Sequence, residues 1–188
     1  KSLIVLNNES LVYLSKIKPY RRILELDEKP LSLSYDNKKD RFLILTPKNI
    51  YEFSLDTLSL RNIYKGKGLT CFEYYQEKIW VGTNNGIYQL ESKNFSVVKF
   101  INKLPHNEIT SLKQINGKLW AGSTRGAFKF RSDGKFDYYA SKRWLLDDGV
   151  ITINSGPDDS VFILTKKGLN KIAFKAMTLE QKASYFQG

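Results

Sequence analysis

The chain contains one cysteine and one histidine in 188 residues, and both scarcities limit its chemistry. A single cysteine, Cys71, excludes an internal disulfide and any metal site made of several cysteines. A single histidine, His106, excludes a pair of histidine metal ligands, and the chain has no Gly-x-Ser-x-Gly segment of the kind that carries a nucleophilic serine. We therefore predict no catalytic residue, no metal site and no cofactor.

Long apolar runs are also missing. No stretch approaches the roughly 18 residues that a membrane-spanning helix requires. The first residues lack the succession of charged, apolar and small residues that marks a signal peptide, and the chain begins with lysine. We expect it to be a processed protein or a piece of a longer one.

Positive charge is in excess, with a formal net charge of +11. Such a charge attracts anionic partners, whether acidic glycans, nucleic acid or a phospholipid surface. The basic residues are spread over every segment in blocks no longer than a pair, which favours a solvated surface over a dedicated patch. Nucleic acid binding would need exposed aromatic residues beside these cations, whereas strand alternation buries one member of a pair such as Tyr74 and Tyr75. The sequence therefore argues against nucleic acid as the partner.

Five segments repeat one pattern, in which a short apolar run, a small turn and a second apolar run follow one another. They begin at residues 3, 42, 79, 119 and 161, about forty residues apart. A period of this length built from strand hairpins is typical of a β-propeller. Aromatic residues make up 13% of the chain, and in such arrays they fill the space between stacked sheets.

Further strand-like runs flank the hairpins. Four hairpins follow a segment with an apolar-Thr/Ser-x-apolar start, which we predict to be the innermost strand of a blade: Leu31–Leu33, Leu69–Phe72, Ile109–Leu112 and Ile151–Ile153. Four hairpins precede a run that fits an outer strand: Arg22–Leu26, Leu60–Tyr64, Phe95–Phe100 and Phe136–Tyr139. Four antiparallel strands per repeat make one propeller blade. The predicted fold class is therefore all-β, a propeller or partial propeller.

The two ends depart from this pattern. Only two residues precede the first hairpin, so the first blade lacks an innermost strand. Residues 175–188 contain helix formers and a capping-box spacing, which predicts a short helical tail or a linker to a missing domain. The repeats, residues 1–174, then form either a compact five-bladed ring or an arc of a larger one. We favour the arc, expect it to self-associate through its open blade edges, and divide it into units 1–29, 30–68, 69–108, 109–149 and 150–174.

Two of the repeats share a Trp-x-Gly-Thr/Ser-x-x-Gly pattern, Ile79–Tyr88 and Leu119–Phe128. The tryptophan fills the gap between blades, the first glycine allows close packing, and the last glycine supplies a positive φ at the hairpin turn. We interpret these residues as scaffold. In these two units strongly, and in the other three weakly, the chain resembles the two-component regulator propeller repeat, a sensor-type β-propeller of bacterial signalling proteins.

The resemblance implies a noncatalytic sensor module in a larger bacterial signalling protein, in the periplasm or outside the cell, with carbohydrate as its ligand. Two alternatives stay open. One is an accessory propeller of a secreted carbohydrate-active enzyme, whose catalytic groups would lie beyond residue 188. The other is a scaffold for protein–protein interaction.

A propeller gathers equivalent loops from successive blades around one face. Hairpin turns and the links into the innermost strands share that face, and their amide, cationic and acidic side chains could hydrogen-bond the hydroxyls or carboxylates of a glycan or another polar ligand. The alternative is ordinary turn chemistry, which also accounts for acidic pairs that could in principle bind Ca²⁺. The candidate ligand-binding residues are Lys48, Asn84, Asn85, His106, Asn107, Arg125, Asp147, Asp148, Lys166 and Lys167.

Overall fold

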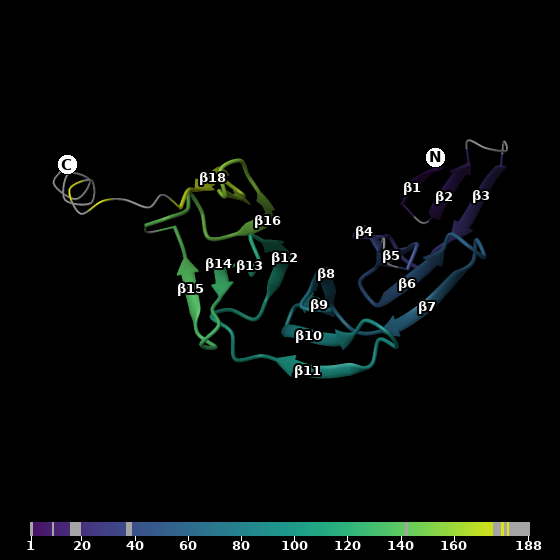
Figure 1. The fold of residues 1–188 in the computed structure, drawn as a ribbon, viewed down its shortest axis with the longest axis horizontal. Coiled ribbons are helices and arrows are strands. Elements are labelled where there is room, and N and C mark those ends of the chain that lie inside the picture. Colours follow the sequence, from purple (N-terminus) through teal and green to yellow (C-terminus); the bar gives the residue numbers. More distant parts are fainter. Residues whose placement is uncertain are drawn as a thin grey trace.

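The computed structural model of the chain describes residues 2–8, 10–15, 20–36, 39–141, 143–174, 178 and 180. Five antiparallel sheets follow one another along the chain and curve into an open arc, with the first and fifth sheets at its opposite ends (Figure 1). The predicted tail falls at residues 175–188, which lie outside the described residues apart from 178 and 180. No helix in the described part is long and apolar enough to cross a membrane.

Each sheet is a meander of strands that are neighbours in sequence. The first sheet contains β1 (Ser2–Leu6), β2 (Ser10–Ser15) and β3 (Tyr20–Glu25). The second contains β4 (Ser32–Asp36), β5 (Arg41–Leu45), β6 (Asn49–Ser54) and β7 (Leu60–Lys65). The third contains β8 (Leu69–Tyr75), β9 (Lys78–Thr83), β10 (Gly86–Glu91) and β11 (Val97–Ile101).

The fourth sheet contains β12 (Ile109–Ile115), β13 (Lys118–Ser123), β14 (Gly126–Phe130) and β15 (Phe136–Tyr139). The fifth contains β16 (Val150–Ser155), β17 (Val161–Thr165) and β18 (Gly168–Ile172). Within the described residues the end sheets thus have three strands and the inner ones four, which confirms the predicted blades and their incomplete ends. The strands β4, β8, β12 and β16 lie on the concave side of the arc, and β7, β11 and β15 lie on its convex side (Figure 1).

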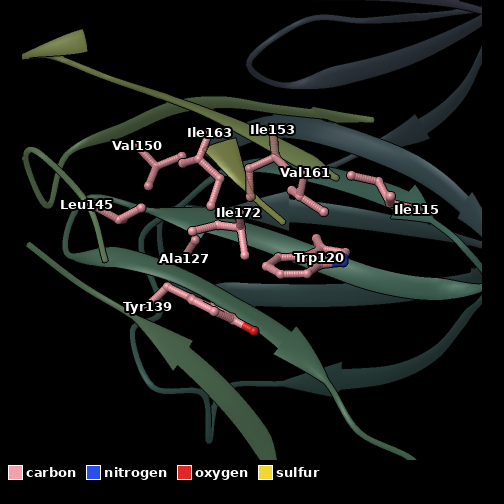
Figure 2. Packing of buried hydrophobic residues seen from close by; sticks show 10 residues of the cluster. All are labelled: Ile115, Trp120, Ala127, Tyr139, Leu145, Val150, Ile153, Val161, Ile163 and Ile172. Carbon is pink, nitrogen blue, oxygen red and sulfur yellow. The ribbon is translucent and has the colours of Figure 1, made fainter. Parts of the chain in front are cut away.

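Apolar side chains fill the space between successive sheets. At the junction of the fourth and fifth sheets, Trp120, Ala127 and Tyr139 pack against residues that include Val161 and Ile163, and all of them are buried (Figure 2). Similar clusters fill the other three junctions. Because each strand alternates its side chains between two faces, every inner sheet contributes to two junctions. The core is therefore four thin layers between sheets.

Glycine lets two junctions close tightly. A Cβ atom at Gly82 would lie 2.7 Å from Cγ2 of Ile109 in the next sheet, and one at Gly122 would lie 2.5 Å from Cγ1 of Val150. Both distances are below what two carbon atoms tolerate, so a side chain at either position would push the sheets apart. The turn glycines Gly86 and Gly126 have φ values of +137° and +117°, which a side chain would strain. The roles expected for the glycines of the Trp-x-Gly pattern are confirmed.

A buried ion network joins the second and third sheets. The guanidinium of Arg41 lies 3.0 Å from Oδ2 of Asp36, also contacts the Glu52 carboxylate, and donates to the backbone oxygen of Ser92 in the third sheet. It also stacks 5.1 Å from the ring centre of Phe95. Arg41 is only 5% exposed, so these partners replace nearly all of its hydration.

Candidate functional site

The concave side of the arc forms a groove of about 370 Å³ between four innermost strands. Its walls are four short segments at equivalent places in the second to fifth sheets: residues 31–34, 70–73, 110–113 and 151–154. Each segment lies at or near the start of its strand, next to the link that enters it from the preceding sheet. The groove therefore begins at the edge of the arc where hairpin turns and links meet.

Three of these strands contain an irregularity at the same point. The pairing register shifts between Leu69 and Cys71, again between Ile109 and Ser111, and again between Val150 and Thr152. In each case one extra residue is left out of the ladder, which is the arrangement of a β-bulge. The extra residues are Thr70, Thr110 and Ile151, and all three line the groove. The bulges thus turn one additional side chain per sheet toward the concave side.

The groove carries polar groups on its walls. Oγ of Ser32 and Oγ1 of Thr110 are buried atoms, and neither has a hydrogen-bond partner within the part of the chain that the structure describes. An unsatisfied buried hydroxyl costs roughly 1–3 kcal/mol. Further along the groove, Nζ of Lys113 lies 3.1 Å from Oε2 of Glu73 in the neighbouring sheet. The walls of the groove therefore carry one ion pair and two hydroxyls that have no partner in the described part of the chain.

Cys71 also lines the groove, but its thiol is directed into the junction. A Cβ atom at Gly82 would lie 2.5 Å from Sγ, and Ile109 of the next sheet borders the same point. Burial raises the pKa of the thiol to about 12, and the hydrogen bond from Thr70 offsets only part of this rise. The interpretation of Cys71 as an inert core thiol rests on this raised pKa and on its packing.

We expect iodoacetamide to alkylate Cys71 at pH 8 at least a hundredfold more slowly in the native protein than in urea. A rise in the thiol pKa from 9 to about 12 lowers its thiolate fraction roughly a thousandfold at this pH. Above pH 9 only the unfolded thiol ionises readily, so stability falls as the pH rises toward 12. Mass spectrometry after timed quenching measures both rates, and equal rates would contradict the buried thiol.

Turns and links share one edge of the arc through backbone hydrogen bonds. The link before the third sheet joins two turns, because Leu69 N donates to Pro47 O at 2.9 Å and Asn84 N donates to Gly68 O at 3.1 Å. Gly126 N donates to Asp148 O at 2.7 Å in the same manner, farther along the arc. We call this edge the loop face: the four turns at residues 46–48, 84–85, 124–125 and 166–167, with the four links that enter β4, β8, β12 and β16.

The structure places all ten predicted ligand-binding residues on the loop face. Lys48, Asn84, Asn85, Arg125, Lys166 and Lys167 lie in hairpin turns, and His106, Asn107, Asp147 and Asp148 lie in links. Whether they bind a ligand stays a prediction. Two of the lysines already have acidic neighbours: Nζ of Lys48 is 2.8 Å from Oε1 of Glu28, and Nζ of Lys167 is 3.9 Å from Oδ2 of Asp147.

The ion pair of Lys48 with Glu28 reduces the positive charge of the loop face. The hydrogen bond from Lys48 lowers the pKa of the Glu28 carboxyl, and Glu28 also accepts from Oγ1 of Thr46 at 2.9 Å. A neutralised lysine attracts an anion less strongly than a free one. Within the described residues no ion pair involves Arg125 or Lys166, so among the four cationic residues of the predicted set these two have no acidic partner.

His106 and Asn107 are neighbours in the link before β12, and His106 contacts a residue of the fourth sheet. Nε2 of His106 is 3.1 Å from the hydroxyl oxygen of Tyr138, which also donates to the backbone oxygen of Arg125. Burial raises the pKa of Tyr138. Oδ1 of Asn107 is a buried oxygen without a hydrogen-bond partner among the described residues.

The acidic pair Asp147–Asp148 makes the hydrogen bonds of a turn. Oδ1 of Asp147 accepts from the backbone nitrogen of Gly149 at 2.8 Å, and Oδ1 of Asp148 accepts from that of Ser141 at 2.7 Å. Both aspartates therefore hold the link into the fifth sheet in shape. In the described part of the chain, no three His, Cys, Asp or Glu side chains are grouped as a metal site would require.

Sequence reasoning missed the groove residues Ser32, Glu73, Thr110 and Lys113. The apolar-Thr/Ser-x-apolar pattern contained a signal, because its hydroxyl residue recurs at the start of successive innermost strands. This recurrence marks Thr70 and Thr110 as equivalent positions. It does not show that their side chains face a groove, because both residues lie at a bulge, where simple alternation fails.

Comparison with solved structures confirms the architecture. The chain superposes on the extracellular domain of the putative one component system BT4673 from B. thetaiotaomicron with a TM-score of 0.77 and 14% identity, over 94% of this chain and 27% of that one. It superposes on the extracellular domain of the putative hybrid two component system BT3049, also from B. thetaiotaomicron, with a TM-score of 0.72 and 18% identity, over 92% and 25%. The fold is a β-propeller arc. The sensor-propeller resemblance seen in the Trp-x-Gly repeats is confirmed at the level of the fold.

The propeller spans about a quarter of the length of these two extracellular domains. An enzyme shares the fold as well: virginiamycin B lyase from Staphylococcus aureus matches with a TM-score of 0.63 and 11% identity, over 90% of this chain and 64% of the lyase. No protein-family model matches the propeller. No curated protein matches it significantly in sequence.

Proposed function

We propose that the propeller is a noncatalytic ligand-binding module of a bacterial sensor protein and acts in the periplasm or outside the cell. The observation that carries this proposal is the concave groove, because two of its buried hydroxyls have no hydrogen-bond partner among the described residues. Buried polar groups are normally hydrogen-bonded, so these two hydroxyls mark a place where water or a ligand completes the hydrogen bonds. Supporting evidence is the fold shared with extracellular domains of putative bacterial sensor systems.

The proposed ligand is a carbohydrate. Ser32 and Thr110 can each donate and accept, and the Glu73–Lys113 pair adds acceptors and donors on the same wall. Sugar hydroxyls also donate and accept, so they match such a surface better than an apolar molecule does. Arg125 and Lys166 at the loop face would favour a sugar that carries a carboxylate, in keeping with the net charge of +11.

The likeness to virginiamycin B lyase favours a second candidate, a propeller that belongs to a secreted enzyme. This candidate requires catalytic groups. The only histidine of the chain, His106, lies in the link before β12 and is hydrogen-bonded to Tyr138. A catalytic domain in the same reading frame, downstream of the propeller, would support the enzyme over the sensor. Binding of a protein partner without glycan affinity would instead support a scaffold.

The test is an array of neutral and uronic-acid oligosaccharides, followed by calorimetric titration of the tightest binder. We expect Thr110→Val, which keeps the side-chain shape, to weaken binding about 3- to 10-fold because one hydrogen bond is lost. Arg125→Ala should weaken only uronic-acid ligands, and this effect should shrink at high salt. Thr57→Val is the matched control, because Thr57 lies in the exposed turn between β6 and β7. An array without binders, or a binder indifferent to Thr110→Val, would contradict the groove.

A further inference from the structure

The outermost strand of the third sheet carries more exposed apolar residues than the outermost strands beside it. Val97, Val98 and Phe100 of β11 are 52%, 47% and 39% exposed. The exposed residues of β7 in the second sheet are all polar: Arg61, Asn62 and Lys65. In β15 of the fourth sheet only Tyr138 is exposed, and its hydroxyl is hydrogen-bonded. Sheets lie on both sides of the third one, and Figure 1 shows β11 on the convex border of the arc.

A β-bulge and a ring contact fix how these side chains stand on the strand. The pairing of β10 with β11 shifts so that Val98 is left out of the ladder between Val97 and Lys99. The ring of Phe100 stacks on that of Tyr88, with 4.5 Å between the ring centres. β11 is the last strand of its sheet, so among the described residues its outer edge has no strand partner. The exposed apolar residues therefore sit on a supported strand with one free edge.

The turn that enters β11 is anchored in the core. Phe95 is 6% exposed, and its backbone nitrogen donates to Glu91 O at 2.9 Å. Glu91 N donates to Ser96 O at 2.9 Å, which closes the turn. The guanidinium of Arg41 in the second sheet stacks on the Phe95 ring. The turn and the strand thus present their exposed side chains from a fixed backbone.

Positive charge surrounds the apolar residues. Three exposed lysines belong to the same segment: Lys93, Lys99 and Lys103. Within the described residues none of them is in an ion pair. Residues 92–103 contain no aspartate or glutamate, and the preceding Glu91 is paired with Lys78. Nζ of Lys39 in the second sheet donates to Ser92 O at 2.8 Å and adds a further positive charge at the turn.

We define the β11 strip as these exposed apolar and basic residues: Lys93, Val97, Val98, Lys99, Phe100 and Lys103. We propose that the β11 strip docks on an anionic lipid surface. Peripheral membrane binding grows with the apolar area that enters the interface and with the attraction of lysines to anionic headgroups, and the strip supplies both. Its place on a convex border lets a flat surface reach it. The free backbone N–H groups at its edge can donate to lipid phosphates in the hydrated headgroup layer.

The first experiment is co-sedimentation of the whole chain with lipid vesicles at about 100 mM NaCl. We expect binding to vesicles of phosphatidylcholine with about 30% phosphatidylglycerol, and at least tenfold weaker binding to phosphatidylcholine alone. High salt should weaken the binding because it screens the lysines. Glycan binding in the groove does not enter this measurement, so the lipid proposal and the proposed function can fail separately.

Matched variants separate the strip from the overall charge of +11. Lys99→Gln should weaken binding roughly fivefold, whereas Lys118→Gln, at an exposed lysine on β13, should leave it almost unchanged. Val98→Ser should weaken binding roughly 3- to 10-fold because apolar area is lost. Ile151→Ser is its control, because Ile151 is also a half-exposed bulge residue but lies on the concave side.

A fluorescent label tests which part of the molecule meets the lipid. Val98→Cys and Lys118→Cys each add one exposed thiol, and the buried thiol of Cys71 reacts slowly. A nitrobenzoxadiazole label at residue 98 should brighten and shift to the blue on phosphatidylglycerol vesicles, and one at residue 118 should not. Circular dichroism checks that each variant is folded. No binding to these vesicles, equal losses in Lys99→Gln and Lys118→Gln, or equal label responses would overturn the proposal. Folded Val98→Ser that binds vesicles like wild type would also overturn it, and would leave a protein as the partner of β11.

Discussion

Arg41→Met is expected to destabilise the propeller by about 3–5 kcal/mol, which is a large part of the stability of a typical domain. The substitution keeps most of the side-chain volume but removes a positive charge that is 5% exposed. Asp36 and Glu52 then face each other without the guanidinium between them. The hydrogen bond to Ser92 O and the stacking on Phe95, which link the second and third sheets, disappear as well. Urea unfolding followed by tryptophan fluorescence measures the loss.

Two further variants separate charge from packing. Asp36→Asn together with Glu52→Gln in the Arg41→Met background removes two carboxylates that have lost their buried cation and should restore part of the lost stability. Glu52 keeps its ion pair with Arg61, so the restored part should come mainly from Asp36. Arg131→Ala is the control for an exposed pair, because Arg131 and Asp133 both lie at the surface, and its cost should stay below about 1 kcal/mol. If Arg41→Met costs no more than Arg131→Ala, the network does not hold the two sheets together.

Trp120→Ala should also destabilise the protein by about 3–5 kcal/mol, the usual cost of deleting a large aromatic ring from a core. Trp120 is 1% exposed, and Figure 2 shows it within the cluster between the fourth and fifth sheets. Its ring packs 5.2 Å from that of Tyr139 and has Nζ of Lys129 5.7 Å from its centre. Truncation leaves a cavity at the junction and exposes the fifth sheet to separate opening.

The three tryptophans differ in their exposed fraction and therefore provide a series of comparisons for this test. Trp80 is 7% exposed at the junction of the third and fourth sheets and should behave like Trp120. Trp144 is 46% exposed in the link before the fifth sheet, so Trp144→Ala should cost less than about 1 kcal/mol. Hydrogen exchange should show that Trp120→Ala lowers protection in β16, β17 and β18 more than in β1 and β2. Uniform loss of protection would contradict the layered core.

The repeat could be predicted because its signals are local. Alternating apolar residues and a turn about every forty residues define each hairpin without knowledge of the rest of the chain. The five hairpins, the four innermost strands and the incomplete ends all followed from such segments. The roles of Gly82 and Gly126 followed in the same way, because a close approach and a positive φ both demand glycine.

The groove could not be predicted in the same manner because it depends on register. A bulge leaves Thr110 out of the pairing, and a sequence pattern with period two does not reveal which strand carries the extra residue. The ion-pair partner of Lys48 could not be predicted from the sequence either. Glu28 is twenty residues away in sequence and meets Lys48 only because a link and a turn share one edge of the arc.

The bulges allow one strand both to pair with its neighbour and to present a side chain to the groove. In β8 and β12 the paired residues hold the ladder and the junction, whereas Thr70 and Thr110 stand outside the pairing and face the groove. Substitution at these positions changes the groove without altering the contacts between sheets. Ile151, the third member of the set, already differs in chemistry from the two threonines. Substitutions at these few unpaired positions would therefore change the chemistry of the groove while the pairing of the strands stays the same.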